Sequence, residues 1–126
     1  MKQEKAQRPS REQTIKDHQE RLNRVLEFIQ DNLDQPMDLN ALARVACFSP
    51  FHFHRIFAAC VGESVSAHIR RVRLERAAHR LRHTRRRITD IALDAAYETP
   101  AAFNKAFRQY FKTTPSAFRT ARPPVG

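Results

Sequence analysis

The sequence predicts an all-α fold, on the basis of three observations. Apolar residues recur at helical spacing along most of the 126-residue chain, as they do in amphipathic helices. The chain has two glycines, Gly62 and Gly126, so the positive-φ turns that β-hairpins need are scarce. One pattern of helix, tight turn and helix occurs twice. Hydrophobic residues make up 41% of the chain, which is enough for a folded core.

The first subdomain is expected over residues 13–64, after a flexible basic tail at residues 1–12. Its first helix lies in RLNRVLEFIQDNL, whose apolar residues share one face, and ends before Pro36. A short second helix lies in MDLNALARVACF, with Asp38 as its expected N-cap. Ser49 and Pro50 then begin a third helix, because a hydroxyl cap followed by proline is typical of a helix start. That helix ends at Gly62, a residue suited to a C-terminal cap.

A long linker helix is expected over residues 65–83, from about Ser66 to His83, and a second helix-turn-helix subdomain over residues 84–120. The apolar side of the linker helix carries Ile69, Val72, Ala77, Ala78 and Leu81. The second subdomain is expected to contain helices at Ile88–Ala95 and Pro100–Phe111, and a short helix after Pro115. Residues 121–126 form a polar C-terminal tail.

An internal repeat supports this division of the chain. LARVACF at residues 42–48 matches IALDAAY at residues 91–97, and SPFHFHRIF at residues 49–57 matches TPAAFNKAF at residues 99–107. Each copy predicts a helix-turn-helix, in which the first helix braces and the second, at about residues 50–61 or 100–111, enters the major groove of DNA. The linker helix between them spans about 27 Å. With its flanking turns it suits two recognition helices about 34 Å apart, one helical repeat of DNA.

Helical periodicity separates the packing side of each recognition helix from the side offered to DNA. The inward side chains are Phe53, Ile56, Phe57 and Cys60 in the first helix, and Phe103, Ala106, Phe107 and Tyr110 or Phe111 in the second. The outward candidates for base contact are Phe51, His54, Arg55, Ala101, Asn104 and Lys105.

Each outward residue type has a chemical reason to read a base. Arg55 can pair with guanine through two hydrogen bonds, and Asn104 can pair in the same way with adenine. His54 can donate or accept at a base edge, Lys105 can reach guanine or phosphate, and Ala101 can touch a thymine methyl group. A phosphate contact or a solvated charge is the alternative for Arg55. Phe51 is either a core residue or a contact to a thymine methyl group or sugar, and the alanine at the matching position 101 favours contact.

The candidates for phosphate contact are Ser49, Thr99, Arg108, Arg85 and Arg86. Ser49 and Thr99 lie at helix N-termini, where free N–H groups and the helix dipole favour an anion. Arg85 and Arg86 belong to a basic run whose alternative role is a solvated charged face.

No metal, cofactor or catalytic site is predicted. His52 and His54 diverge on a helix, because residues two apart point about 200° from each other. His79 and His83 share a face but lack a third ligand nearby. The chain has no glycine-rich phosphate loop and no nucleophile with an identifiable base, so an enzyme is not expected.

Charge and cysteine content point to an intracellular polyanion-binding protein. Lys and Arg number 23 against 13 acidic residues, a net charge of +10, which favours DNA, RNA or another anionic partner. No apolar run is long enough for a transmembrane helix. Cys47 and Cys60 stand alone among apolar neighbours and are expected to be buried thiols in a reducing cytoplasm.

These motifs resemble the DNA-binding domain of the AraC/XylS family of bacterial transcription regulators, over roughly residues 18–120. The resemblance implies a seven-helix domain of two subdomains joined by a rigid helix. It also implies a protein in the cytoplasm with the nucleoid that binds double-stranded DNA as a monomer, unless an effector domain is attached, and that activates transcription through RNA polymerase. The family's base-facing positions fall on the same six outward residues. The alternative is a sequence-tolerant basic protein that binds nucleoid DNA or RNA.

This sequence departs from the family pattern at three turns. The family usually has glycine where this chain has Cys47, Ala96 and Lys112, so these turns are either strained or built differently. The chain is expected to be a stand-alone regulator or the N-terminal part of a longer one with an effector domain such as a GyrI-like domain. Its ending, RPPVG, resembles a linker and favours the second alternative.

Overall fold

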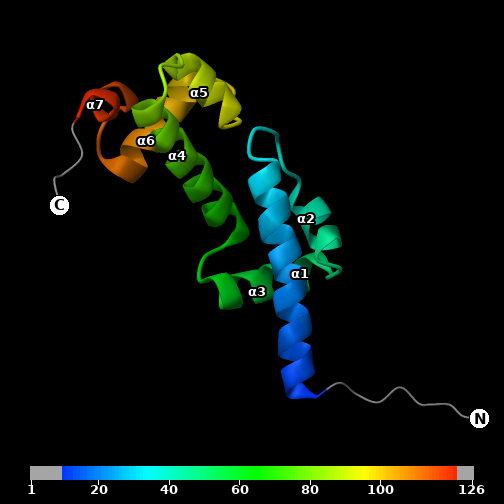
Figure 1. The fold of residues 1–126 in the computed structure, drawn as a ribbon. Coiled ribbons are helices and arrows are strands. Elements are labelled where there is room, and N and C mark those ends of the chain that lie inside the picture. Colours follow the sequence, from blue (N-terminus) through cyan, green and yellow to red (C-terminus); the bar gives the residue numbers. More distant parts are fainter. Residues whose placement is uncertain (1–9, 122–126) are drawn as a thin grey trace, which may run out of the picture.

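The structure is a computed structural model that describes residues 10–121. All regular elements within this range are helices, which confirms the predicted all-α fold. They are α1 (Arg11–Asp31), α2 (Leu39–Val45), α3 (Pro50–Val61), α4 (Val65–His83), α5 (Ile88–Asp94), α6 (Pro100–Phe111) and α7 (Pro115–Thr120). Figure 1 shows α1, α2 and α3 together beside the start of α4, whereas α5, α6 and α7 gather around its far end. Residues 1–9 of the predicted basic tail and residues 122–126 of the predicted C-terminal tail lie outside the described residues.

The helices begin and end largely where their capping residues predict. Ser49 Oγ accepts a hydrogen bond from the N–H of His52 at 3.3 Å, and Thr99 Oγ1 accepts one from the N–H of Ala102 at 3.0 Å. Asp38 caps α2. Gly62 follows α3 in the left-handed conformation, as predicted for a C-terminal cap. Local side-chain chemistry therefore defines both ends of α3.

The first helix begins earlier than the sequence predicted. It starts at Arg11, within the expected tail, because Ser10 and Gln13 form a capping box that satisfies each other's backbone N–H groups. The linker helix spans Val65–His83, the residues 65–83 expected from the sequence, and Ser64 is its N-cap.

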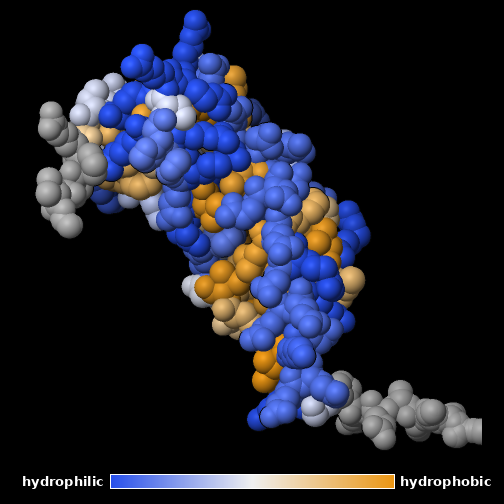
Figure 2. Space-filling view, in the orientation of Figure 1, coloured by the Kyte–Doolittle hydropathy of each residue, from blue (hydrophilic) through white to orange (hydrophobic). Residues whose placement is uncertain are grey.

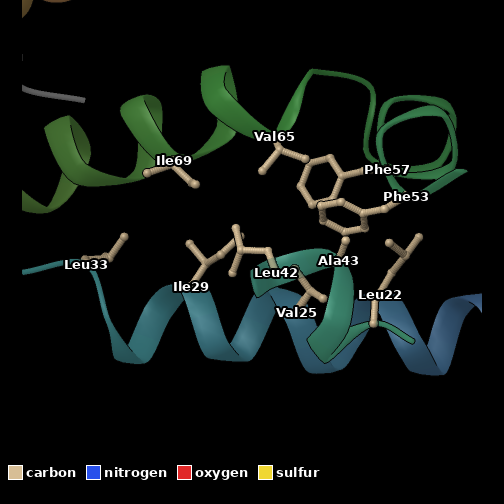
Figure 3. Packing of buried hydrophobic residues seen from close by; sticks show 11 residues of the cluster. Leu22, Val25, Ile29, Leu33, Leu42, Ala43, Phe53, Phe57, Val65 and Ile69 are labelled. Atoms are coloured by element: carbon tan, nitrogen blue, oxygen red, sulfur yellow. The ribbon is translucent and has the colours of Figure 1, made fainter. Parts of the chain in front are cut away.

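The first subdomain packs around two phenylalanines of α3. Figure 3 shows Phe53 and Phe57 lying against apolar side chains from α1, α2 and the start of α4. Both phenylalanines are fully buried, as predicted, and Ile56 is partly buried. The buried members of this core are Leu22, Val25, Ile29, Leu33, Leu42, Ala43, Ala46, Phe53, Phe57, Val65 and Ile69.

The second subdomain repeats this packing around Phe103 and Phe107, which are also fully buried. Its other buried residues are Leu74, Ala77, Ala78, Leu81, Ile91, Ala92 and Ala95. Helix α4 therefore contributes its first half to one core and its second half to the other. Leu74, which lies outside the single apolar side predicted for this helix, is completely buried.

The expectation of buried cysteines was wrong. Cys47 and Cys60 are both exposed. Cys47 lies in the turn between α2 and α3 with a φ of 60°, a left-handed turn position rather than a place in the core. Cys60 lies in the last turn of α3, where Ala58 and Ala59 are exposed as well. The partly buried Val61, rather than Cys60, continues the packing side of this helix after Phe57.

The three turn positions that depart from the family's glycines all adopt positive φ. Cys47, Ala96 and Lys112 have φ values of 60°, 65° and 63°. A left-handed conformation costs a residue with a Cβ atom about 1–2 kcal/mol. Cys47 and Ala96 occupy equivalent turns in the two copies of the repeat, so both copies carry the same strain.

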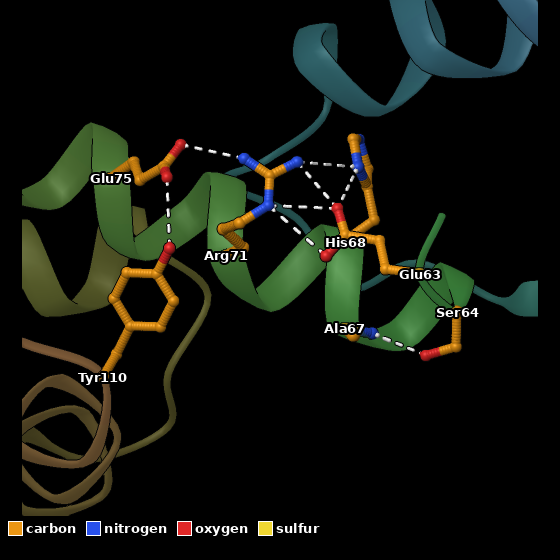
Figure 4. A network of polar contacts seen from close by, with 7 residues as sticks. All are labelled: Glu63, Ser64, Ala67, His68, Arg71, Glu75 and Tyr110. Atoms are coloured by element: carbon orange, nitrogen blue, oxygen red, sulfur yellow. Dashed lines mark hydrogen bonds and ion pairs between the residues drawn. The ribbon is translucent and has the colours of Figure 1, made fainter. Parts of the chain in front are cut away.

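Polar contacts run along α4 between the two subdomains (Figure 4). The guanidinium of Arg71 donates to Glu63 at 2.7 Å and to Glu75 at 3.1 Å. His68 Nδ1 lies 3.1 Å from Glu63, and Tyr110 donates its hydroxyl to Glu75 at 3.2 Å. The hydrogen bond from Arg71 lowers the pKa of Glu63, with smaller effects from His68. Burial and the bond to Glu75 raise the pKa of Tyr110.

We expect Ala96→Gly to raise the free energy of unfolding by about 1 kcal/mol, because glycine adopts positive φ without strain. Urea denaturation followed by circular dichroism measures this change. Ala58→Gly is the matched control: Ala58 is exposed inside α3, and glycine there should lower stability by about 1 kcal/mol. A loss of stability in both variants would contradict the strain at residue 96.

We expect Glu63→Gln to destabilise the fold at neutral pH but not in acid. The lowered pKa of Glu63 means that its charge contributes stability above its ordinary value of 4.5, and that this contribution disappears as the pH falls through the lowered value. Because Glu63 is partly exposed, the loss at pH 7 should be about 1 kcal/mol. Thermal unfolding between pH 7 and pH 3 measures it, with the exposed change Glu98→Gln as control. A constant difference between Glu63→Gln and the wild type across that range would refute this account.

Candidate nucleic-acid interface

Helices α3 and α6 present nearly identical exposed faces. Each has 12 residues, begins with proline after a hydroxyl cap, and buries two phenylalanines four residues apart. Their remaining side chains follow the same sequence of exposed and partly buried positions from the first residue of the helix to the last. Both helices therefore have a free side for a ligand, built from equivalent positions.

The outward residues predicted on α3 are all exposed. Phe51 is 73% exposed, so it is not part of the core. The guanidinium carbon of Arg55 lies 5.6 Å from the centre of the Phe51 ring, within the range of a cation–π contact. His54 is exposed beside them. Phe51, His54 and Arg55 thus form one aromatic and basic surface on α3.

The outward residues predicted on α6 lie together along one shallow groove. Ala101, Asn104, Lys105 and Arg108 all line it, and two further residues, Gln109 and Lys112, complete it. Gln109 and Lys112 were not among the predicted interface residues. Both follow Lys105 at spacings that keep them on or near one helical face, so periodicity could have found them.

The N-terminus of α3 borders a second groove, which extends to α1. Residues of α1 line one side, and Cys47, Phe48, Ser49 and His52 line the other. Arg21 crosses it: its guanidinium lies 4.7 Å from the centre of the Phe48 ring and donates to the carbonyl of Cys47 at 3.2 Å. No local pattern links Arg21 to a turn 26 residues away, so sequence reasoning could not find this contact.

Ser49 and Thr99 use their hydroxyl oxygens to cap α3 and α6. Each hydroxyl hydrogen can still donate to an anion. The two caps therefore lie where the N–H groups and the dipole of each helix also favour negative charge.

The basic run between α4 and α5 is partly occupied by contacts within the protein. Arg86 and Arg80 both pair with Asp94, and the guanidinium of Arg82 lies 3.9 Å from the centre of the Phe118 ring. Arg85 is exposed. Of the two phosphate candidates in this run, Arg86 is thus engaged with a carboxylate, which sequence reasoning did not anticipate.

The histidines that suggested a metal site lie in aromatic contacts. The ring of His52 lies 5.3 Å from Phe48 and 6.0 Å from His18, centre to centre. The rings of His79 and His83 lie 4.3 Å apart. Among residues 10–121, no three or more His, Cys, Asp or Glu side chains come together in a way that could hold a metal ion. In the same part of the chain, none of the helices has the length and apolar character needed to cross a bilayer.

Comparison with known proteins gives consistent matches. A helix-turn-helix domain family matches residues 42–121. The regulatory protein SoxS of Salmonella typhimurium is 34% identical over 102 residues, which are 81% of this chain and 95% of SoxS. The transcriptional regulator YbfP of Bacillus subtilis is 37% identical over 103 residues, and the right origin-binding protein of Escherichia coli is 35% identical over 109. These matches cover 82% and 80% of this chain but 35% and 38% of the two relatives, so the chain spans little more than a third of their length.

Solved structures share the fold. A transcriptional regulator from Chromobacterium violaceum, of the AraC type, superposes with a TM-score of 0.77 at 25% identity, covering 84% of this chain and 96% of that one. The DNA-binding domain of the global transcriptional factor AdpA, solved in complex with a target DNA, superposes with a TM-score of 0.74 at 23% identity. That match covers 78% of this chain and 88% of the AdpA chain.

Proposed function

Because the chain belongs to the AraC-type family of helix-turn-helix DNA-binding transcription regulators, we propose that it binds double-stranded DNA sequence-specifically through α3 and α6. The observation that carries this proposal is the duplicated exposed face. Two capped helices with equivalent outward side chains lie at opposite ends of α4 (Figure 1). Each would enter one of two successive major-groove segments on one side of the duplex.

The outward residues divide into base readers and phosphate contacts in this proposal. Phe51, His54 and Arg55 of α3 read bases, as do Ala101, Asn104 and Lys105 of α6. The phosphate contacts are Ser49, Thr99, Arg108, Arg85 and Arg86. Arg86 would share its guanidinium between phosphate and Asp94, because it is already paired with that carboxylate.

Helix α3 carries more of the sequence preference than α6. The side chains of Phe51 and Arg55 are large and reach well beyond the backbone, whereas the matching positions of α6 hold Ala101 and Lys105. Alanine can touch at most a thymine methyl group, and lysine lacks the planar fork that recognises guanine. The groove on α6 also holds Arg108 and Lys112, which suits phosphate contacts more than base reading.

The regulator acts as a monomer on DNA unless an effector domain is attached, because one chain supplies both helix-turn-helix units. We place it in the bacterial cytoplasm with nucleoid DNA, and we propose that it activates transcription through RNA polymerase, in keeping with its family. An effector domain of the GyrI-like type elsewhere on the polypeptide stays a prediction.

We expect the full chain to prefer a specific site strongly over other DNA. A duplex selected from a random library should bind about a thousandfold or more tightly than its shuffled sequence at physiological salt. Fluorescence anisotropy with unlabelled competitor measures this ratio. Equal affinity for selected and shuffled duplexes would instead support sequence-tolerant binding to nucleoid DNA, and equal or tighter binding to RNA would support an RNA-associated role.

We expect Arg55→Ala and Lys105→Ala to affect recognition differently. Loss of Arg55 should relax the preference at one base position by about 1–3 kcal/mol. Loss of Lys105, which can reach phosphate as well as guanine, should change base preference less, weaken binding to all duplexes and reduce the salt slope by about 1. Single-base variants of the selected site measure both effects. Arg55→Lys is the matched control, since it keeps the charge but loses the fork. Equal losses for Arg55→Ala and Lys105→Ala, with unchanged base preference, would contradict the division between α3 and α6.

A further inference from the structure

Helix α4 is joined to the two subdomains unequally. Its second half is buried in the second core through Leu74 and Leu81, so it moves as one body with α5, α6 and α7. Its first half contributes Val65 and Ile69 to the first core. The connection from α3 is short and contains Gly62, whose φ is 91°.

The seam between α4 and the first subdomain is partly open to solvent. A surface groove lies there, lined by residues of α4, by Met37 just before α2 and Leu39 at its start, and by the turn between α5 and α6. Figure 2 shows hydrophobic side chains at the surface along this seam, on a face that is otherwise mostly hydrophilic. Apolar packing therefore leaves the angle between α4 and the first subdomain less well determined than the angle between α4 and the second.

Arg73 bridges this seam. Its Nε atom donates to the carbonyl of Leu33 at 3.0 Å, and its Nη2 atom donates to the carbonyl of Gln35 at 2.6 Å. Both carbonyls lie in the connection between α1 and α2. Burial lowers the pKa of Arg73, as expected for a cation that is partly removed from water. Two hydrogen bonds from one planar group fix both the position and the direction of α4 at this point.

Arg71 also holds α4 to the first subdomain, near the start of the helix, and we call this junction the joint. Its bonds to Glu63 connect the body of α4 to the turn that follows α3 (Figure 4). Arg71 and Arg73 thus attach α4 to two separate parts of the first subdomain.

A small rotation at this joint has a large effect at the far end of α4. The helix has 19 residues and is about 28 Å long at ~1.5 Å per residue. A rotation of about 7° moves its far end by about 3.4 Å, the rise of one base pair. The second recognition helix moves with that end.

We propose that Arg73, assisted by the Arg71–Glu63 pair, is a positioning residue that sets the spacing between the DNA segments bound by α3 and α6. This inference rests on the proposed function, because spacing has meaning only where both helices bind DNA. Arg73 itself touches no base. It acts by holding α4, and with it α6, at one angle to the first subdomain.

Arg76 offers a matched control on the same helix. Its Nη2 atom donates to the carbonyl of Asp94 at 2.6 Å, and burial lowers its pKa as it does for Arg73. This hydrogen bond lies within the second subdomain, so its loss removes no hydrogen bond between α4 and the first subdomain, although the charge of Arg76 also interacts with Asp34 in the connection between α1 and α2.

The test compares Arg73→Met and Arg76→Met in the full chain, since methionine keeps much of the aliphatic stem and removes the donors. Binding is measured on the selected duplex and on duplexes with one base pair inserted or deleted between the two contacted segments. We expect the wild type and Arg76→Met to bind the shifted duplexes about tenfold more weakly, through loss of one of two linked contact sets. Arg73→Met should reduce that penalty to about threefold or less, because the joint then accommodates both spacings at modest cost. Arg73→Lys, which keeps the charge and one donor group, should fall between them.

The outcomes for the inference about Arg73 and for the proposed function can be told apart. An unchanged spacing penalty in Arg73→Met, or an equal reduction in Arg76→Met, overturns the inference while leaving the proposed function intact. Failure of the wild type to distinguish selected from shuffled DNA overturns the proposed function instead. If Arg73→Met does not fold by circular dichroism, Glu63→Ala decides, since it releases Arg71 from the turn after α3 at a partly exposed site. A reduced penalty in that variant supports the inference, and an unchanged penalty refutes it.

Discussion

Helix α4 is buried at both ends, but in two different hydrophobic cores. Val65 and Ile69 pack with the phenylalanines of α3, and Leu74 and Leu81 pack with those of α6. Neither subdomain is large enough to bury much apolar surface alone, so each depends on the half of α4 that it covers. Because α4 is held in both cores, the position of α3 relative to α6 depends on how α4 packs in each core.

The repeat extends further than the two recognition helices. Gly62 and Lys112 end α3 and α6 in the same left-handed conformation, and a hydroxyl cap follows two residues later in both copies. His68 then packs edge-on against Phe57 at 5.5 Å, as Phe118 packs against Phe107 at 5.4 Å. The short helix α7 is therefore the counterpart of the first turn of α4. The two copies differ in the chemistry of this ring. In the first copy it is His68 of the linker helix, which contacts Glu63. In the second copy it is Phe118, which is apolar and lies under the guanidinium of Arg82.

Local signals made most of the fold predictable. Ser49–Pro50 and Thr99–Pro100 carry their own capping chemistry, so the starts of both recognition helices could be read from neighbouring residues. The exposure of Cys60 could not, because Cys60 and Val61 both follow Phe57 at helical spacing, and periodicity alone does not show that Val61 is the one that packs against the core. The hydrogen bonds of Arg73 could not be predicted from the sequence either, since its carbonyl partners lie 38 and 40 residues away. Of the candidate interface, the outward faces were predictable from helical periodicity, and the ion pair between Arg86 and Asp94 was not.

Net charge overstates how many cations the protein offers to DNA. The excess of basic residues includes arginines that bond to the protein itself: Arg73 and Arg76 donate to backbone carbonyls, and Arg71 is held by two glutamates. A guanidinium already bonded within the protein gains less from a phosphate than one surrounded by water, because it must share or exchange its partners. The salt dependence of binding counts phosphates neutralised rather than formal charge. In the proposed DNA complex, Arg71, Arg73 and Arg76 would therefore contribute mainly through geometry, by fixing where α3 and α6 lie, while the side chains of those two helices would supply the contacts.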